Sequence, residues 1–270
     1  GMGTAFIATI GVLGAVVAGV LVETLSWRAC YIVGGSMGLL LLFLRISVKE
    51  SGMFHALNAQ SEISKGSIRL LFSSKDKIQR YVLCILVGMP IWYVAGIVMT
   101  LSPELGVVLG VTEPILASRS IAISYLGLAV GDFLSGVLSQ YFKSRKKVLI
   151  GFELFTILSL IALFILSPQQ SANFYYVICF IVGIGAGFWA LFVTVCSEQF
   201  GTNLRATVTT TVPNLVRGSL ILMNLYLTFL RDHMSFFQAT IVTGVTVFSL
   251  CIVSTLLLRE TFSKDLDYTE

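Results

Sequence analysis

Polar residues follow one face of an otherwise apolar stretch between Leu204 and Arg231. Their steps of three, four and seven place them on the same side of an α-helix. The stripe consists of Thr207, Thr210, Asn214, Arg217, Asn224 and Thr228. At about 1.5 Å per residue it runs roughly 30 Å, which is the thickness of the hydrocarbon core of a bilayer. The spacing therefore predicts a polar track across a membrane.

Arg217 stands near the middle of this track. A guanidinium at mid-bilayer costs at least ~2.5 kcal/mol on insertion scales, so such a residue usually lines water, meets a carboxylate or meets a ligand. We therefore expect the stripe to line a solute pathway. The alternative is that Arg217 only ties neighbouring helices together, through backbone carbonyls or a buried carboxylate.

Two carboxylates fall inside apolar segments. Asp132 lies past the middle of segment 119–141, and Glu153 lies near the start of segment 148–166. An ionisable side chain inside a membrane is a functional candidate by default. We expect these carboxylates to take up and release protons in proton coupling. Asp132 is the preferred candidate and Glu153 is the second. The alternative for Asp132 is an ion pair with the basic cluster 143–147 at the end of its helix.

Aromatic residues form a third candidate set. Trp92 and Tyr93 follow Pro90, and Trp189 follows the glycine-rich run 183–187. Small-molecule sites are lined mainly by apolar and aromatic side chains, so these residues are candidate ligand walls, with core packing as the alternative for Trp92. Small residues at four-residue spacing predict closely packed helix seams instead. The seam residues are Gly11, Ala15 and Gly19, and then Gly127, Gly131, Ser135 and Ser139.

The composition excludes a soluble globular protein. Of the 270 residues, 56% are hydrophobic and 12% charged, and the net charge of +4 gives no reason to expect nucleic acid as a partner. The five cysteines lie in apolar runs without a CxxC motif, so we expect neither disulfides nor a metal, and no cofactor. We expect no enzyme, because His55 and His233 fall on opposite sides of the predicted membrane and no HExxH motif is present.

Eight apolar segments of spanning length divide the chain. They are 4–23, 29–46, 80–102, 119–141, 148–166, 173–196, 207–230 and 237–258. The N-terminal segment lacks a basic region before it, so we interpret it as a spanning helix and not as a signal peptide. The second, fifth and eighth segments are mostly large aliphatic and aromatic residues, which suits helices that face lipid.

The polar stretch 47–79 separates two helices from six. It predicts a piece 1–46, a cytoplasmic loop 47–79, a six-helix domain 80–258 and a tail 259–270. Most of the 18 Lys and Arg residues fall on the side of the loop, which makes that side cytoplasmic by the positive-inside rule. Both ends of this sequence are then cytoplasmic, and we expect a multi-pass protein of the cell membrane.

Several short motifs together resemble the major facilitator superfamily, in its metabolite:proton symporter and sugar-porter-like branch. Segment 136–146 is similar to the basic loop of that family, although Gln140 stands where the loop has an acidic residue and Lys143 where it has glycine. Segment 197–207 is similar to the stretch after its tenth helix. Further matches are Trp27-Arg28, Glu50-Ser51 with Phe54, and Glu260-Thr261 with Leu266-Asp267.

The resemblance implies an all-α polytopic membrane protein. The eight segments would be helices five to twelve of a two-domain, twelve-helix fold: the last two of the N-terminal domain and all six of the C-terminal domain. The first four helices of the same carrier would be a missing partner. Such proteins work by alternating access around a central site. Glu198, Arg205 and Arg145 resemble the cytoplasmic gate of the family.

The resemblance also bears on the solute. Arg217 lies twelve residues after Arg205, where carriers of organic anions and aromatic acids often have arginine and carriers of organic cations have aspartate. The planar guanidinium suits a carboxylate. We expect transport of a small organic anion together with protons, in contact with membrane lipid. Arg217 would bind the carboxylate, and the residues shaping the site would be Asn214, Trp92, Tyr93, Trp189 and Asn224. The alternatives are a truncated, non-transporting remnant, or a carrier of a neutral or zwitterionic metabolite.

Overall fold

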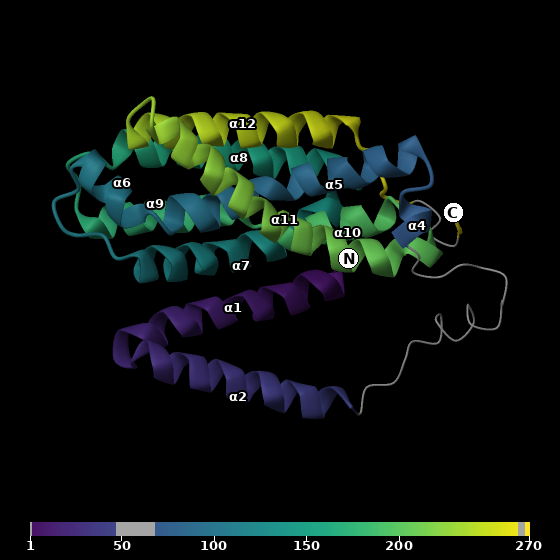
Figure 1. The fold of residues 1–270 in the computed structure, drawn as a ribbon, viewed down its shortest axis with the longest axis horizontal. Helices are drawn as coiled ribbons and strands as arrows, with labels where there is room; N and C mark the ends of the chain where they lie inside the picture. Colours follow the sequence, from purple (N-terminus) through teal and green to yellow (C-terminus); the bar gives the residue numbers. More distant parts are fainter. Residues whose placement is uncertain (1, 47–67, 264–267) are drawn as a thin grey trace.

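The structure is a computed structural model that describes residues 2–46, 68–263 and 268–270. Every element in this part of the chain is helical, which confirms the all-α fold class (Figure 1). The elements are α1 (Met2–Thr24), α2 (Trp27–Arg45), α4 (Ile68–Leu71), α5 (Lys75–Tyr93), the π-helix η1 (Val94–Met99), α6 (Ser102–Leu109), α7 (Ala117–Tyr141), α8 (Arg145–Leu166), α9 (Ala172–Ala186), α10 (Trp189–Glu198), α11 (Thr202–Arg231) and α12 (Phe236–Leu257). The motif residues Glu50, Ser51, Phe54, Leu266 and Asp267 lie outside the described residues.

Helices lie at all eight predicted positions. Within the described residues, six helical spans are long and apolar enough to cross a membrane: α2, α5–η1, α7, α8, α9–α10 and α12. Here α5 and η1 count as one span, and so do α9 and α10. The described apolar part of α1 is shorter, Ile10–Thr24. α11 has 30 residues, but its polar stripe lowers its hydropathy. The chain is a multi-pass membrane protein.

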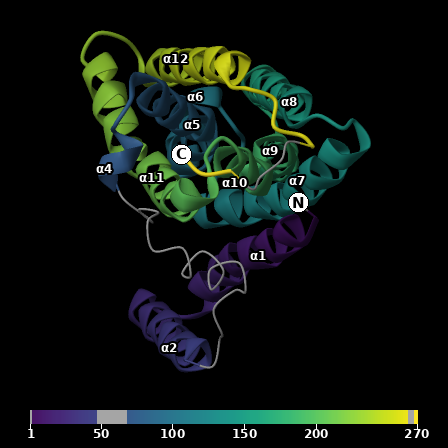
Figure 2. The same cartoon turned by 90° about the vertical axis from the view of Figure 1, so that its right-hand side faces the viewer.

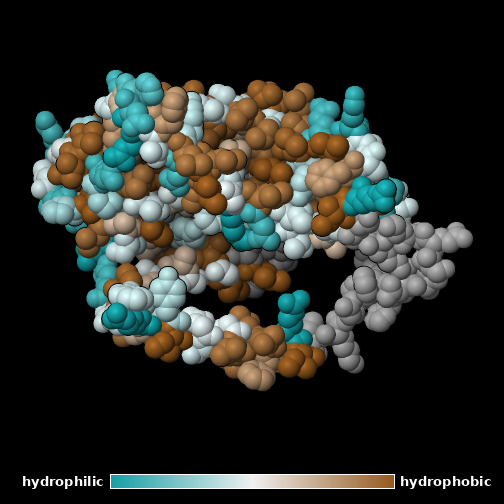
Figure 3. Space-filling model, in the orientation of Figure 1, coloured by the Kyte–Doolittle hydropathy of each residue, from teal (hydrophilic) through white to brown (hydrophobic). Residues whose placement is uncertain are grey.

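The helices form a bundle with a two-helix layer against it. α5 and α7 to α12 make up the bundle, α1 packs along α7, and α2 lies beyond α1 (Figures 1 and 2). No residue of α2 is buried. On the face drawn in Figure 3, apolar residues predominate along the middle of the helices and hydrophilic residues gather towards their ends. This distribution is the one that a bilayer requires.

Glycines allow α7 and α9 to approach closely. A Cβ atom on Gly127 would lie 2.1 Å from the carbonyl oxygen of Phe180, and one on Gly183 would lie 2.0 Å from that of Ser124. These positions accept no side chain without separating the two backbones. The predicted seam on α7 is therefore a packing surface. On α1 the seam is partial, because Gly19 packs against Ala122 while a Cβ atom on Gly11 would meet nothing within 4 Å.

Two predicted spans are not continuous α-helices. Segment 173–196 breaks after Gly187 into α9 and α10, and segment 80–102 becomes the π-helix η1 after Tyr93. Pro90 lies one turn before η1; it has no N–H to donate, and its ring disturbs the preceding turn. α5 also begins earlier than predicted, at Lys75, because the Ser74 hydroxyl caps it by accepting from the Lys77 N–H.

The turn between α7 and α8 contains a residue in the left-handed region. Lys143 has a φ of 50°. Glycine adopts this conformation without steric cost, whereas other residues pay about 1–2 kcal/mol. The lysine therefore stands at a backbone position that suits the glycine of the basic loop motif.

Candidate functional site

A cavity lies between α1, α5, α7, α10 and α11 in the middle of the molecule. Its volume is about 350 Å³, at the low end of the range for small-molecule sites. It is lined by Gly11, Val12, Ala15, Ile91, Trp92, Ala95, Tyr125, Leu128, Trp189 and Arg217. Arg217 is the one charged side chain among these lining residues. The cavity is thus an apolar chamber with a single cation.

Arg217 is held by an amide and two indole rings. Its Nη1 donates to Asn214 Oδ1 at 3.0 Å. Its Cζ lies 5.3 Å from the ring centroid of Trp189 and 6.0 Å from that of Trp92, within reach of cation–π attraction. The two indole rings pack edge to face with centroids 6.5 Å apart. The structure therefore brings together four of the predicted site residues.

The predicted alternative for Arg217, an ion pair with a buried carboxylate, is not observed among the described residues. Among the ion pairs of the described residues none involves Arg217, and its side chain is exposed to the cavity. Its side-chain hydrogen bond goes to Asn214 on its own helix and not to a backbone carbonyl of another described helix. In the described part of the chain, the positive charge of Arg217 is not neutralised by a carboxylate.

Two predicted site residues lie elsewhere. Tyr93 is buried and points to α12, where its hydroxyl donates to the Thr240 carbonyl at 2.8 Å and its ring packs on Phe248. Trp92 and its neighbour Ile91 line the cavity, whereas Tyr93 packs against α12. Asn224 lies on the same face of α11 as Arg217, two turns further on, and its amide donates to the Leu220 carbonyl at 3.0 Å. Neither residue lines the cavity.

Tyr125 lines the cavity, and sequence reasoning missed it. The signal was available in part, because a tyrosine inside an apolar span has a polar hydroxyl that needs a partner. Its direction could not be read, since it depends on how α7 packs against α1, α9 and α10. Asp132, seven residues later on α7, drew attention instead.

Asp132 caps the broken helix. It is fully buried, and its Oδ1 accepts a hydrogen bond from the Ala190 N–H at 3.0 Å, in the first turn of α10. A carboxylate is favourable there because the first N–H groups of a helix lack partners and carry partial positive charge. No described ion pair joins Asp132 to the cluster 143–147, so that alternative is wrong. Asp132 Oδ2 has no hydrogen-bond partner among the described residues.

Glu153 lies between α8 and α12. It is fully buried and accepts a hydrogen bond from the Thr255 hydroxyl. It does not line the cavity around Arg217. Neither membrane carboxylate lines the cavity, and each is hydrogen-bonded to a second helix.

The three predicted gate residues meet at the end of the bundle. Arg145 pairs with Glu198 at 3.2 Å and also donates to the Ser139 hydroxyl at 2.8 Å. Arg205 donates to the carbonyl of Ser197, next to Glu198, at 3.2 Å. The pair joins the start of α8 to the end of α10, and Thr261 of the tail donates to Glu198 at 2.6 Å.

The tail adds a carboxylate to this end. Glu260 accepts hydrogen bonds from the backbone N–H groups of Arg145 and Lys146, at 2.9 and 3.2 Å, and from the Ser144 hydroxyl. Partial burial opposes ionisation of Glu260, but these hydrogen bonds and that from the Phe262 N–H outweigh it and lower the pKa to about 2. The tail is therefore fastened to the first turn of α8 by a stable anion.

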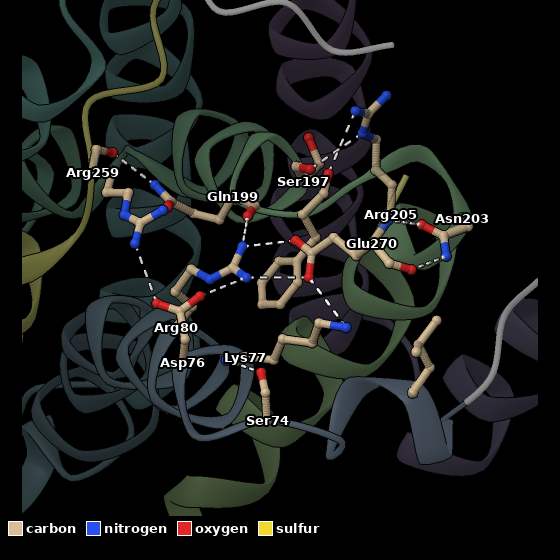
Figure 4. Close-up of polar contacts among 12 residues, drawn as sticks. Ser74, Asp76, Lys77, Arg80, Ser197, Gln199, Asn203, Arg205, Arg259 and Glu270 are labelled. Carbon is tan, nitrogen blue, oxygen red and sulfur yellow. Dashed lines mark hydrogen bonds and ion pairs between the residues drawn. The ribbon is translucent and has the colours of Figure 1, made fainter. Parts of the chain in front are cut away.

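A second network at the same end was not predicted. Arg80 of α5 pairs with Glu270 at 2.8 Å and with Asp76 at 2.8 Å, and Arg259 reaches Asp76 at 3.3 Å (Figure 4). Asn203 of α11 exchanges two 3.0 Å hydrogen bonds with the backbone of Glu270. The i,i+4 spacing of Asp76 and Arg80 is a sequence signal for one of these pairs. No local sequence pattern predicts the contacts between this network and the tail.

One protein-family model covers most of the chain. The family model described as Major Facilitator Superfamily matches residues 1–222. No match was found among curated proteins or among solved structures. The matched region includes α1, α2 and the bundle as far as Leu222, and it therefore contains all the residues that line the cavity. The chain belongs to the major facilitator superfamily of membrane transporters.

Proposed function

We propose that this chain carries a small organic anion across the cell membrane by alternating access, coupled to protons. The observation that supports it most is Arg217, a permanent cation that faces a mid-membrane cavity and has no carboxylate partner among the described residues. An unneutralised guanidinium in apolar surroundings is costly. A carboxylate solute would supply the missing charge and accept two parallel hydrogen bonds from the guanidinium.

The proposed division of the chain puts the cavity between two bodies. Residues 1–46 would belong to one domain and 80–258 to the other, with 47–79 as the cytoplasmic loop and 259–270 as a tail on the second domain. The lining residues come from both, because Gly11, Val12 and Ala15 lie on α1. Rocking of one body against the other would open the cavity to each side in turn. In this arrangement further helices of the first domain would cover the exposed α2.

The experiment is carboxylate counterflow in proteoliposomes, with Arg217→Ala and Arg217→Lys compared with the wild-type chain. We expect Arg217→Ala to lower saturable carboxylate flux at least about tenfold, because charge-assisted bonds are worth roughly 1.5–3 kcal/mol. Arg217→Lys should also be impaired, since an ammonium lacks the planar fork.

Arg231 provides the matched control. It lies on the same helix, outside the cavity, in an exposed pair with Glu104 at 3.2 Å. Arg231→Ala should transport at close to the wild-type rate, because exposed ion pairs contribute little. Carboxylate flux that survives Arg217→Ala would overturn the anion proposal. A wild-type chain that is folded but shows no saturable flux would favour the non-transporting alternative.

A further inference from the structure

The cavity around Arg217 contains one positive charge, and the rest of its lining is mostly apolar. Apart from Arg217, the polar groups among the lining side chains are the hydroxyl of Tyr125 and the indole N–H groups of Trp92 and Trp189. We propose that the cavity selects a monocarboxylate with a flat apolar body, such as a single aromatic ring, and that Tyr125 is a specificity-determining residue for it. This inference rests on the proposed function and names its class of solute.

The charge of the cavity limits the solute to one anionic group. Asp132 and Glu153 are bound to other helices, and no second cation lines the cavity among the described residues. A second carboxylate on the solute would lose its water without gaining a partner, which is costly in apolar surroundings. A neutral analogue would leave the guanidinium uncompensated. Both should bind more weakly than a monoanion of the same size.

The walls favour a flat ring. The Trp92 and Trp189 rings pack edge to face at 6.5 Å, and Ile91, Leu128 and Val12 complete an apolar lining. Aromatic pairs gain energy in this geometry beyond the area that they bury. The volume of about 350 Å³ suits a small acid of one ring. A short acid such as acetate would leave most of this apolar surface uncovered.

Two lining residues, Trp92 and Tyr125, carry hydrogen-bond donors. The Nε1 of Trp92 is buried in the protein and has no partner among the described residues, so the Tyr125 hydroxyl is the donor that we assign to the solute. An ionised carboxylate has about four lone-pair sites, more than one guanidinium fork uses. Tyr125 lines the cavity from α7 and Arg217 lines it from α11, so both side chains border the space that the anion would occupy.

The test is binding by tryptophan fluorescence on the purified full chain in nanodiscs. The chain has three tryptophans, two of which line the cavity, so a Trp27→Phe background leaves two reporters at the site. The probes are benzoate, acetate, succinate and benzamide at constant ionic strength. We expect benzoate to bind at least about tenfold more tightly than the other three, from ring burial and charge together. Tyr125→Phe should weaken benzoate about three- to tenfold.

Glycines of α1 give a steric test with a matched control. A Cβ atom on Gly11 or on Gly14 would meet nothing within 4 Å, but only Gly11 lines the cavity. Gly11→Leu should abolish benzoate binding by filling the chamber, while Gly14→Leu should bind like the parent. Equal binding by these two variants would overturn the inference.

The probe series separates the two proposals. Succinate or acetate that binds as tightly as benzoate, and is lost in Arg217→Ala, would overturn the selection for a flat monocarboxylate and leave the anion carrier standing. No binding of any carboxylate by a folded chain would overturn both. Benzoate binding that is unchanged in Tyr125→Phe would remove Tyr125 as the specificity-determining residue.

Discussion

At the scale of single residues, Arg217 and Asp132 illustrate two ways of placing a charge inside a membrane. Asp132 is enclosed by protein and bound to the start of α10, where helix N–H groups need an acceptor. Arg217 faces a cavity and is flanked by Asn214 and two indole rings. The first arrangement stabilises a helix, and the second leaves the charge available to a ligand.

Asp132→Asn separates the structural role of this residue from its proposed role in proton coupling. Asparagine keeps an acceptor for the Ala190 N–H but cannot ionise. We expect Asp132→Asn to retain carboxylate exchange in proteoliposomes and to lose accumulation driven by a pH gradient. Asp132→Ala should in addition unfold more easily, by about 1 kcal/mol, because it removes the cap. Undiminished accumulation in Asp132→Asn would exclude it from coupling.

Glu260 gives a prediction about pH. Its pKa in the folded chain is about 2, below the ordinary value of 4.5, so the ionised carboxylate stabilises the fold above pH 4.5 and this contribution is lost as the pH falls from 4.5 towards 2. We expect Glu260→Gln to lower the Tm of the purified protein by a constant amount between pH 8 and pH 5.5, and by less at pH 3.

The control for this measurement is Glu104→Gln, which removes a carboxylate from an exposed pair with Arg231. It should change the Tm little at any pH. A Glu260→Gln variant as stable as the wild type at pH 7 would show that the tail contact with α8 contributes nothing.

Sequence periodicity predicted part of the site and missed part of it. Asn214 and Arg217 were found together because their spacing is a property of one helix. Trp92 and Tyr93 were grouped because they are adjacent in sequence, but Trp92 lines the cavity together with Ile91, whereas Tyr93 packs against α12. Tyr125 was missed because its direction depends on packing between helices.

At the scale of elements, the helix positions followed from apolar runs of spanning length. The break between α9 and α10 did not, because Asp132 of another helix supplies the cap that a new helix start needs. The seam between α7 and α9 was predicted from α7 alone, where small residues recur every four positions. Its partner glycines on α9 could be identified only from the packed structure.

The seam can be tested with one methyl group. A Cβ atom on Gly183 would lie 2.0 Å from the Ser124 carbonyl oxygen, whereas one on Gly151 would meet nothing within 4 Å. Both lie within α-helices, so alanine gains about 1 kcal/mol of helix propensity at each. We expect Gly183→Ala to be less stable than Gly151→Ala by about 2 kcal/mol or more in thermal unfolding, because overpacking forces the backbones apart. Equal stability would contradict the close approach of α7 and α9.

At the scale of the whole molecule, the end of the bundle that carries the tail differs in chemistry from the middle. At that end, the Arg145–Glu198 pair joins the start of α8 to α10, and Arg80 near the start of α5 pairs with Glu270 of the tail, as Figure 4 shows for Arg80. The middle holds the cavity, where α1 meets the bundle. In the proposed alternating-access mechanism, these ion pairs would hold this end closed while the site is open to the other.

If the polar face of α11 lines a solute pathway, cysteines placed on it should be accessible to a water-soluble reagent. Asn214→Cys and Leu215→Cys, made in a background without the five native cysteines, place a thiol on the polar face and on the neighbouring face of the same helix turn. We expect a membrane-impermeant maleimide to label Asn214→Cys and benzoate to slow that labelling, while Leu215→Cys reacts slowly with or without benzoate. Labelling confined to Leu215→Cys, or an inert Asn214→Cys in a folded chain, would contradict the account.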